Sequence, residues 1–221
     1  MIQVILCDDH ALIRRGIRDT LADAADIQVV GEAGDYGELR ALLRGLATVG
    51  ESGHATRCDV LLLDINLPGR SGLDVLHVLK DEGSPVKVLV VSMYPEDQYA
   101  IRALRAGAYG YVNKGGDPQL IVQAVRTVAQ GRKYVTPEIA QMLVESLTAP
   151  THENAHDKLS DRELQTLVMI ASGKRLADIA EELTLSPKTV SVYRARVLEK
   201  LGLQNNAELT VYAIRNGLVG D

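Results

Sequence analysis

The first 131 residues alternate short apolar runs with amphipathic segments. Segments with helical periodicity lie near 11–24, 35–47, 72–81, 95–106 and 117–130. The apolar runs, rich in β-branched residues, predict strands at Ile2–Leu6, Gln28–Val30, Val60–Leu63, Val86–Val91 and Tyr109–Val112. Runs such as VLLL and VKVLVV do not alternate with polar residues, so these strands are expected to be buried on both faces. The pattern therefore predicts an α/β domain over 1–131, with helices covering both faces of a parallel sheet.

The pattern changes after residue 131. One helix is predicted from about Pro137 to Leu147, because proline suits the first position of a helix. Thr148–Lys158 contains no Val, Ile or Leu and predicts a linker, so 132–158 are expected to be a connecting helix and linker. From 159 to 221 the pattern is helical throughout, which predicts a small all-α bundle. Its four helices are expected near 160–173, 176–183, 186–202 and 207–216.

The composition is that of an ordinary globular protein, with 46% hydrophobic and 24% charged residues, which argues against a disordered or fibrous chain. No apolar run approaches the ~18 residues that span a bilayer. The start, MIQVILCDDH, lacks the basic region of a signal peptide, so we expect a cytoplasmic protein without a membrane partner. Cys7 and Cys58 have no CxxC or His spacing, and we expect buried free thiols.

The net charge of −5 argues against nucleic-acid binding by the chain as a whole, because neutralising phosphates requires clustered Lys and Arg. The stretch 186–202 is an exception, since four basic residues there face only Glu199. The chain has neither Phe nor Trp, which removes the stacking platforms that single-strand binders generally need. Any nucleic-acid contact is therefore expected at 186–202.

Polar residues follow four of the predicted strands at the point where each ends. Because the carboxyl ends of parallel strands share one edge of the sheet, these side chains are expected to meet there. They are Asp8, Asp9, Asp64, Ser92, Asn113 and Lys114. Three carboxylates in a small pocket repel one another unless a divalent cation neutralises them, and hard oxygen ligands favour Mg²⁺. Any one Asp is explained as well by a helix N-cap, but the coincidence over four strands favours a site for phosphoryl transfer.

The segments VILCDDH, LLLDINLPGRSGLDVL, VLVVSMY and GAYGYVNKG resemble, in order, the receiver domain of bacterial two-component response regulators. The resemblance covers about residues 1–130 and implies a flavodoxin-like, doubly wound, five-stranded sheet. It also implies that Asp64 accepts a phosphoryl group from a sensor histidine kinase. One departure is the Gly-, Ser- and Thr-bearing segment Thr48–Arg57, which predicts a surface insertion before the third strand, away from the site.

The same resemblance implies a metal site and a switch around Asp64. The Mg²⁺ ligands it implies are Asp8, Asp9, Asp64 and the backbone carbonyl of Asn66. Lys114 is implied to contact the phosphoryl group, while Ser92 and Tyr111 change rotamer or position on phosphorylation.

In the helical domain, LADIAEELTLSPKTVSVYRARVLEKLGL predicts a helix, a tight turn and a second helix. Val190, Val197 and Leu201 have the spacing of buried positions on that second helix. Basic and small residues occupy the rest of its surface, which fits insertion into a major groove. A plain protein-interaction bundle is the alternative, because such folds serve many functions.

The string over 159–219 resembles the LuxR-type helix-turn-helix, so the whole chain is similar to the NarL/FixJ subfamily of response regulators. The resemblance implies a transcription factor that binds double-stranded promoter DNA, forms a homodimer on activation, and has RNA polymerase as a further candidate partner. Base edges are implied to meet Ser191, Val192 and Ala195. The DNA backbone is implied to meet Lys188, Thr189, Arg194, Arg196 and Lys200. Members commonly carry Lys or Arg at the place of Ser191.

Three other functions fit parts of the sequence. A Mg²⁺-dependent phosphatase or phosphotransferase would use Asp64 as nucleophile, but Ile65–Asn66 stand where such an enzyme needs a second carboxylate. A ligand-responsive quorum sensor resembles only the helical domain, and its pocket is rich in aromatic residues. A receiver that is never phosphorylated would act through dimerisation alone. The favoured interpretation is a phosphorylation-controlled regulator rather than a metabolic enzyme.

Overall fold

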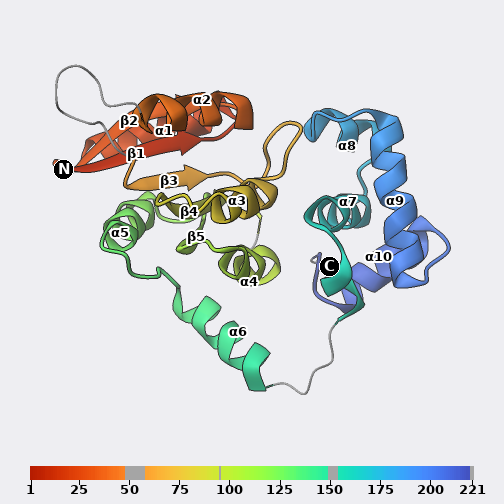
Figure 1. The fold of residues 1–221 in the computed structure, drawn as a ribbon. Coiled ribbons are helices and arrows are strands. Elements are labelled where there is room, and N and C mark those ends of the chain that lie inside the picture. Colours follow the sequence, from red (N-terminus) through yellow and green to blue (C-terminus); the bar gives the residue numbers. More distant parts are fainter. Residues whose placement is uncertain (48–57, 95, 149–153, 220–221) are drawn as a thin grey trace. The chain divides into compact units, whose positions relative to one another are not determined.

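The computed structural model describes residues 1–47, 58–94, 96–148 and 154–219 (Figure 1). The chain forms two compact units, Met1–Thr148 and Ala149–Asp221. The predicted insertion at 48–57 lies outside the described residues. Not one of the described helices combines the length and the apolar character needed to cross a bilayer.

The first unit is built on a five-stranded parallel sheet in the order β2-β1-β3-β4-β5 (Figure 1). The strands are β1 (Ile2–Cys7), β2 (Ile27–Ala33), β3 (Val60–Leu63), β4 (Lys87–Ser92) and β5 (Gly110–Asn113). This order confirms the predicted α/β fold class. β2 continues three residues beyond the predicted run. Gly31 and Glu32 of this edge strand are only half-buried, so the apolar pattern breaks there although the strand goes on to the buried Ala33.

Helices cover both faces of this sheet. They are α1 (Ala11–Ala22), α2 (Tyr36–Ala47), α3 (Gly72–Asp81), α4 (Glu96–Ala106) and α5 (Pro118–Ala129). A sixth helix, α6 (Pro137–Thr148), follows them in the chain. Ile17 of α1 and Val125 of α5 share one core cluster with Leu62 of β3. The alternate strand residues, such as Ile5 and Leu61, are equally buried, and right-handed crossovers place α2, α3 and α4 over them. α6 packs on α4.

The second unit is all-helical. Its elements are the 3₁₀ turn η1 (Ala155–Lys158) and the helices α7 (Asp161–Ala171), α8 (Leu176–Glu182), α9 (Pro187–Leu201) and α10 (Asn206–Arg215). α7 packs on α9 and α10, and α8 packs on α9. Ser160 and Glu163 form the capping box that starts α7, and Gly202 ends α9 in the left-handed conformation with φ 66°.

The last residues of the predicted linker, Ala155–Lys158, form the 3₁₀ turn and are hydrogen-bonded to the helical unit. The His156 backbone N–H donates to Tyr212 Oη of α10 at 3.2 Å, and His156 Nδ1 lies 3.0 Å from the same oxygen. Lys158 accepts a hydrogen bond from Lys200 through its carbonyl oxygen. These contacts are polar, so a segment without large aliphatic residues is still held on the helical unit.

Candidate functional site

The ends of β1, β3 and β5 bring three charged side chains together. Lys114 Nζ lies 2.7 Å from Asp8 Oδ2 and 2.7 Å from Asp64 Oδ2. None of the three side chains is more than 5% exposed. One ammonium group therefore bridges two buried carboxylates, which the sheet places side by side because Cys7 pairs with Leu63 in the parallel register.

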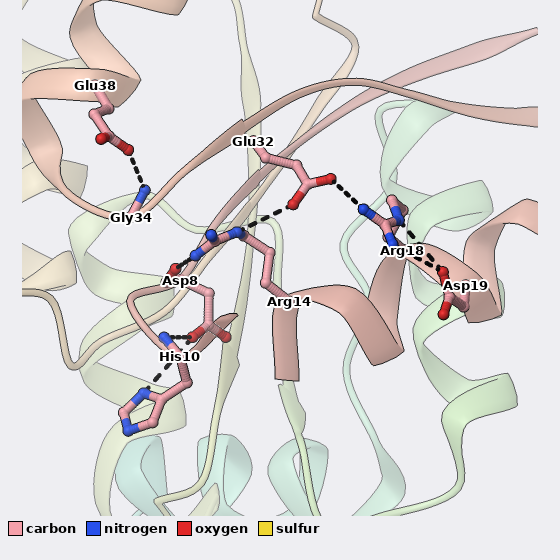
Figure 2. A network of polar contacts seen from close by, with 8 residues as sticks. All are labelled: Asp8, His10, Arg14, Arg18, Asp19, Glu32, Gly34 and Glu38. Atoms are coloured by element: carbon pink, nitrogen blue, oxygen red, sulfur yellow. Dashed lines mark hydrogen bonds and ion pairs between the residues drawn. The ribbon is translucent and has the colours of Figure 1, made fainter. Parts of the chain in front are cut away.

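Asp9 and His10 form the outer side of this acidic pocket. The His10 Nδ1 atom lies 2.5 Å from Asp9 Oδ1. The His10 backbone N–H donates to Asp8 Oδ1 at 2.8 Å (Figure 2). One potential ligand atom from each of Asp8, Asp9, His10 and Asp64 lies within 4.8 Å of all the others. The sequence interpretation did not include His10, and the only signal for it was its place directly after the two aspartates.

The donor set fits a hard divalent cation. Three aspartates and one lysine carry a formal charge of −2, leaving the imidazole aside, and a divalent cation cancels it. Asn66 Oδ1 is a further buried oxygen that has no hydrogen-bond partner among the described residues. Carboxylate and amide oxygens are ligands that suit Mg²⁺, so the chemistry of the pocket agrees with that ion.

Burial dominates the electrostatics of Asp64. Desolvation raises the pKa of its carboxyl from 3.8 to about 6. The Lys114 ammonium and a hydrogen bond from the Asn66 backbone oppose this rise, whereas the negative charge of Asp8 adds to it. Burial therefore disfavours the ionised form of Asp64. A bound cation would favour that form.

The backbone of Asp64 is packed directly against the start of α3. A Cβ on Gly72 would lie 2.0 Å from the Asp64 carbonyl oxygen, which no side chain can tolerate. The Gly72 N–H donates to the carbonyl oxygen of Ile65 at 2.8 Å, and Ser71 caps the helix. Glycine at 72 is therefore required for the helix to approach the residue at the centre of the pocket.

Ser92 and Tyr111 lie beside the acidic pocket and meet at the residue Tyr94. Ser92 Oγ accepts from the Tyr94 N–H at 3.2 Å, and Tyr111 Oη donates to the Tyr94 carbonyl oxygen at 2.7 Å. Burial raises the pKa of Tyr111, while hydrogen bonding to Ser92 lowers it. The Lys114 N–H donates to the Ser92 carbonyl oxygen at 2.8 Å, which links this pair to the pocket.

α9 presents the second set of predicted site residues. Val190 and Val197 are fully buried, and Leu201 is half-buried, so the predicted inner face of the helix is confirmed. The outer surface exposes six of the predicted DNA-contact residues. They are Lys188, Ser191, Val192, Ala195, Arg196 and Lys200.

Three of the predicted DNA-contact residues, the exposed Lys200 among them, contact other side chains of the unit. Lys200 Nζ lies 2.7 Å from the buried Glu163 carboxylate, and Arg194 Nε donates to Asn206 Oδ1 at 2.6 Å. Thr189 Oγ1 lies 2.8 Å from Ser186 Oγ at the helix cap. Sequence spacing could not separate these residues from the other five, because their partners lie on the flanking helices and turns.

Two family models match the chain. One, the response regulator receiver domain, matches residues 4–126. The other, the bacterial regulatory proteins of the luxR family, matches residues 157–213. Both describe regulatory proteins, and one match lies in each of the two units.

The chain is similar to named regulators over nearly its whole length. It is 40% identical over 220 residues to response regulator GacA of Pseudomonas aeruginosa, covering 99% of this chain and 98% of that protein. It is 39% identical over 219 residues to response regulator UvrY of Escherichia coli, covering 99% and 96%. A solved structure of RcsB from Salmonella enterica serovar Typhimurium, bound to promoter rprA in the presence of phosphomimetic BeF3−, is 26% identical with a TM-score of 0.61, covering 96% of this chain and 97% of that chain.

Proposed function

The chain belongs to the NarL/FixJ-type response regulators, which join a receiver domain to a LuxR-type DNA-binding domain, and we propose that phosphorylation of Asp64 controls its binding to promoter DNA. The observation that carries the proposal is the buried contact of Lys114 with both Asp8 and Asp64. A bridging ammonium beside an acceptor carboxylate is suited to the charge of an incoming phosphoryl group.

The proposed chemistry is transfer of a phosphoryl group from a phosphohistidine of a sensor kinase. An oxygen of the ionised Asp64 carboxylate attacks phosphorus, and the bond from phosphorus to the donor nitrogen breaks, which leaves an acyl phosphate on Asp64. Lys114 then pairs with the phosphoryl oxygens. Mg²⁺, held by Asp8, Asp9, Asp64 and the backbone carbonyl of Asn66, would supply neutralisation of the added negative charge.

The proposed output is binding of the helical unit to double-stranded promoter DNA. The exposed outer surface of α9 supports it, and so does the similar Salmonella structure, which holds promoter DNA in the presence of a phosphomimetic. We infer that phosphorylation repositions Ser92 and Tyr111 and favours a homodimer, because joining two small modules makes the second DNA contact intramolecular. We propose that the regulator acts in the cytoplasm, where the chromosomal promoters lie. RNA polymerase is a further proposed partner.

The test of the phosphorylation step is an intact-mass measurement with acetyl phosphate as donor. The full chain should gain about 80 Da when Mg²⁺ is present. Asp64→Asn should gain nothing, whereas Asp74→Asn, at an exposed position in the first turn of α3, should behave as wild type. Asp9→Ala should be phosphorylated more slowly. A label that persists in Asp64→Asn contradicts the proposed acceptor.

A further inference from the structure

Arg14, in the first turns of α1, contacts the backbone of the acidic pocket. Its Nη1 donates to the carbonyl oxygen of Asp8, and its Nε donates to Glu32 Oε2 at 3.1 Å (Figure 2). Only 20% of the Arg14 side chain is exposed. Its guanidinium therefore joins the end of β1 to a carboxylate on the neighbouring strand β2.

Glu32 is itself held in place from two sides. Its second oxygen, Oε1, accepts from Arg18 Nη1 at 3.1 Å, one turn further along α1 (Figure 2). Glu32 thus accepts from two arginines of one helix, which fixes the direction from which it contacts Arg14. A carboxylate shared in this way orients the guanidinium that reaches Asp8.

The Asp8 carbonyl has a special place in the pocket. This C=O belongs to the same planar peptide group as the N–H of Asp9. A hydrogen bond that fixes the carbonyl direction therefore fixes the plane of the Asp8–Asp9 peptide, and with it the direction in which the Asp9 side chain leaves the backbone. The planar fork of arginine can hold a carbonyl and a carboxylate at once, whereas lysine offers a single charged point.

The next residue of the same helix shows none of these features. Arg15 is 72% exposed, and its ion pair with Asp19 at 3.8 Å involves a carboxylate that is 61% exposed. It has the same charge and the same helix, but no contact with the acidic pocket among the described residues. Arg15 is therefore the matched control for Arg14.

We propose that Arg14, oriented by Glu32, is a positioning residue that sets the Asp8–Asp9 peptide and thereby the affinity of the acidic pocket for Mg²⁺. The inference rests on the proposed function, because it takes the pocket to be a Mg²⁺ site. Neither residue touches the ion in this account. They act through the ligands that they orient. Loss of a residue that orients a metal ligand typically weakens metal affinity 10–100-fold.

The experiment is a calorimetric Mg²⁺ titration of the full chain, with variants chosen to separate positioning from folding. Arg14→Ala should weaken Mg²⁺ binding by about tenfold. Arg14→Lys keeps the positive charge, and Glu32→Gln keeps a hydrogen-bond acceptor. Each of these two variants should weaken Mg²⁺ binding by less than Arg14→Ala does. Arg15→Ala should match the wild type, and Asp9→Ala should lose most of the affinity. In the metal-free protein, the amide ¹H–¹⁵N resonance of Asp9 should shift in Arg14→Ala and stay in place in Arg15→Ala.

Two failures can be told apart. If Arg14→Ala is folded and binds Mg²⁺ as the wild type does while Asp9→Ala does not, the positioning role is wrong and the proposed function stands. If wild type and Asp9→Ala take up Mg²⁺ equally, the proposed metal site itself is wrong. Should Arg14→Ala fail to fold, wild-type Mg²⁺ affinity in both Arg14→Lys and Glu32→Gln would overturn the inference, and reduced affinity would support it.

Discussion

The acidic pocket and the outer surface of α9 are built in opposite ways. The pocket draws buried side chains from strand ends far apart in the sequence, and Lys114 contacts two of them at 2.7 Å. The α9 surface draws exposed side chains from a single helix. In the pocket, function depends on positions that the whole sheet must hold. On α9, it depends on which side chains the rest of the helical unit leaves available.

The difference predicts how each region responds to substitution. The pocket should be sensitive to changes in backbone and packing that leave every charged residue in place. The α9 surface should respond mainly to the loss of individual side chains, and Lys200 and Arg194 are already engaged elsewhere in the unit. Three sets of substitutions test this contrast.

The largest effect is expected at Gly72. Gly72→Ala brings a Cβ to 2.0 Å from the Asp64 carbonyl oxygen, so backbone must move. We expect a loss of about 3 kcal/mol in the free energy of unfolding, the upper end of overpacking costs. Gly16→Ala is the control, because nothing lies within 4 Å of its Cβ and alanine favours a helix interior. Urea unfolding measures both, and equal stability of the two variants would contradict the close approach.

The next effect comes from the charge on buried Asp64. Its pKa is raised from 3.8 to about 6, so the folded protein binds a proton more tightly than the unfolded chain. The stability this group contributes is full below pH 3.8 and is lost as the pH rises through about 6. Without Mg²⁺, Asp64→Asn should therefore be more stable than wild type by about 2–3 kcal/mol at pH 8. The gain should shrink as the pH falls to 4, and a gain that is independent of pH would contradict the burial argument.

The smallest effects are expected on α9. Arg196→Ala should weaken DNA binding several-fold and lower the salt slope by about one. Lys200→Ala should lower that slope by less, because its ammonium is paired with Glu163. Ser191→Ala should change base preference rather than the slope. Salt titrations of binding to one promoter fragment measure all three. Equal slopes for Lys200→Ala and Arg196→Ala would show that the ion pair with Glu163 does not reduce the contact of Lys200 with DNA phosphates.

Much of the fold could be predicted from the sequence, because its strands and helices have strong periodic patterns. The five predicted strands overlap the observed ones, and the helix α9 begins at Pro187 and ends before Gly202 as its capping residues indicate. The edge strand β2 was underestimated, since Gly31 and Glu32 interrupt its apolar run. That interruption is informative in hindsight, because Glu32 is the carboxylate that meets Arg14.

From the strand pattern alone, only those residues of the candidate site that lie at the end of a strand could be predicted. Asp8, Asp64 and Lys114 meet because all three follow parallel strands, which a sequence pattern can indicate. Arg14 could not be found in this way, since its importance comes from contacts with a backbone carbonyl and with another strand. The pairing of Lys200 with Glu163 was hidden for the same reason.

The central claim is that phosphorylation of Asp64 controls DNA binding, and one measurement tests it directly. The affinity of the full chain for a promoter fragment is measured at fixed salt, with Mg²⁺, before and after treatment with acetyl phosphate, for wild type and Asp64→Asn. We predict a rise of about 5–150-fold in wild type, the usual range of allosteric coupling, and no rise in Asp64→Asn. An unchanged affinity in phosphorylated wild type, or an equal rise in Asp64→Asn, would contradict the account.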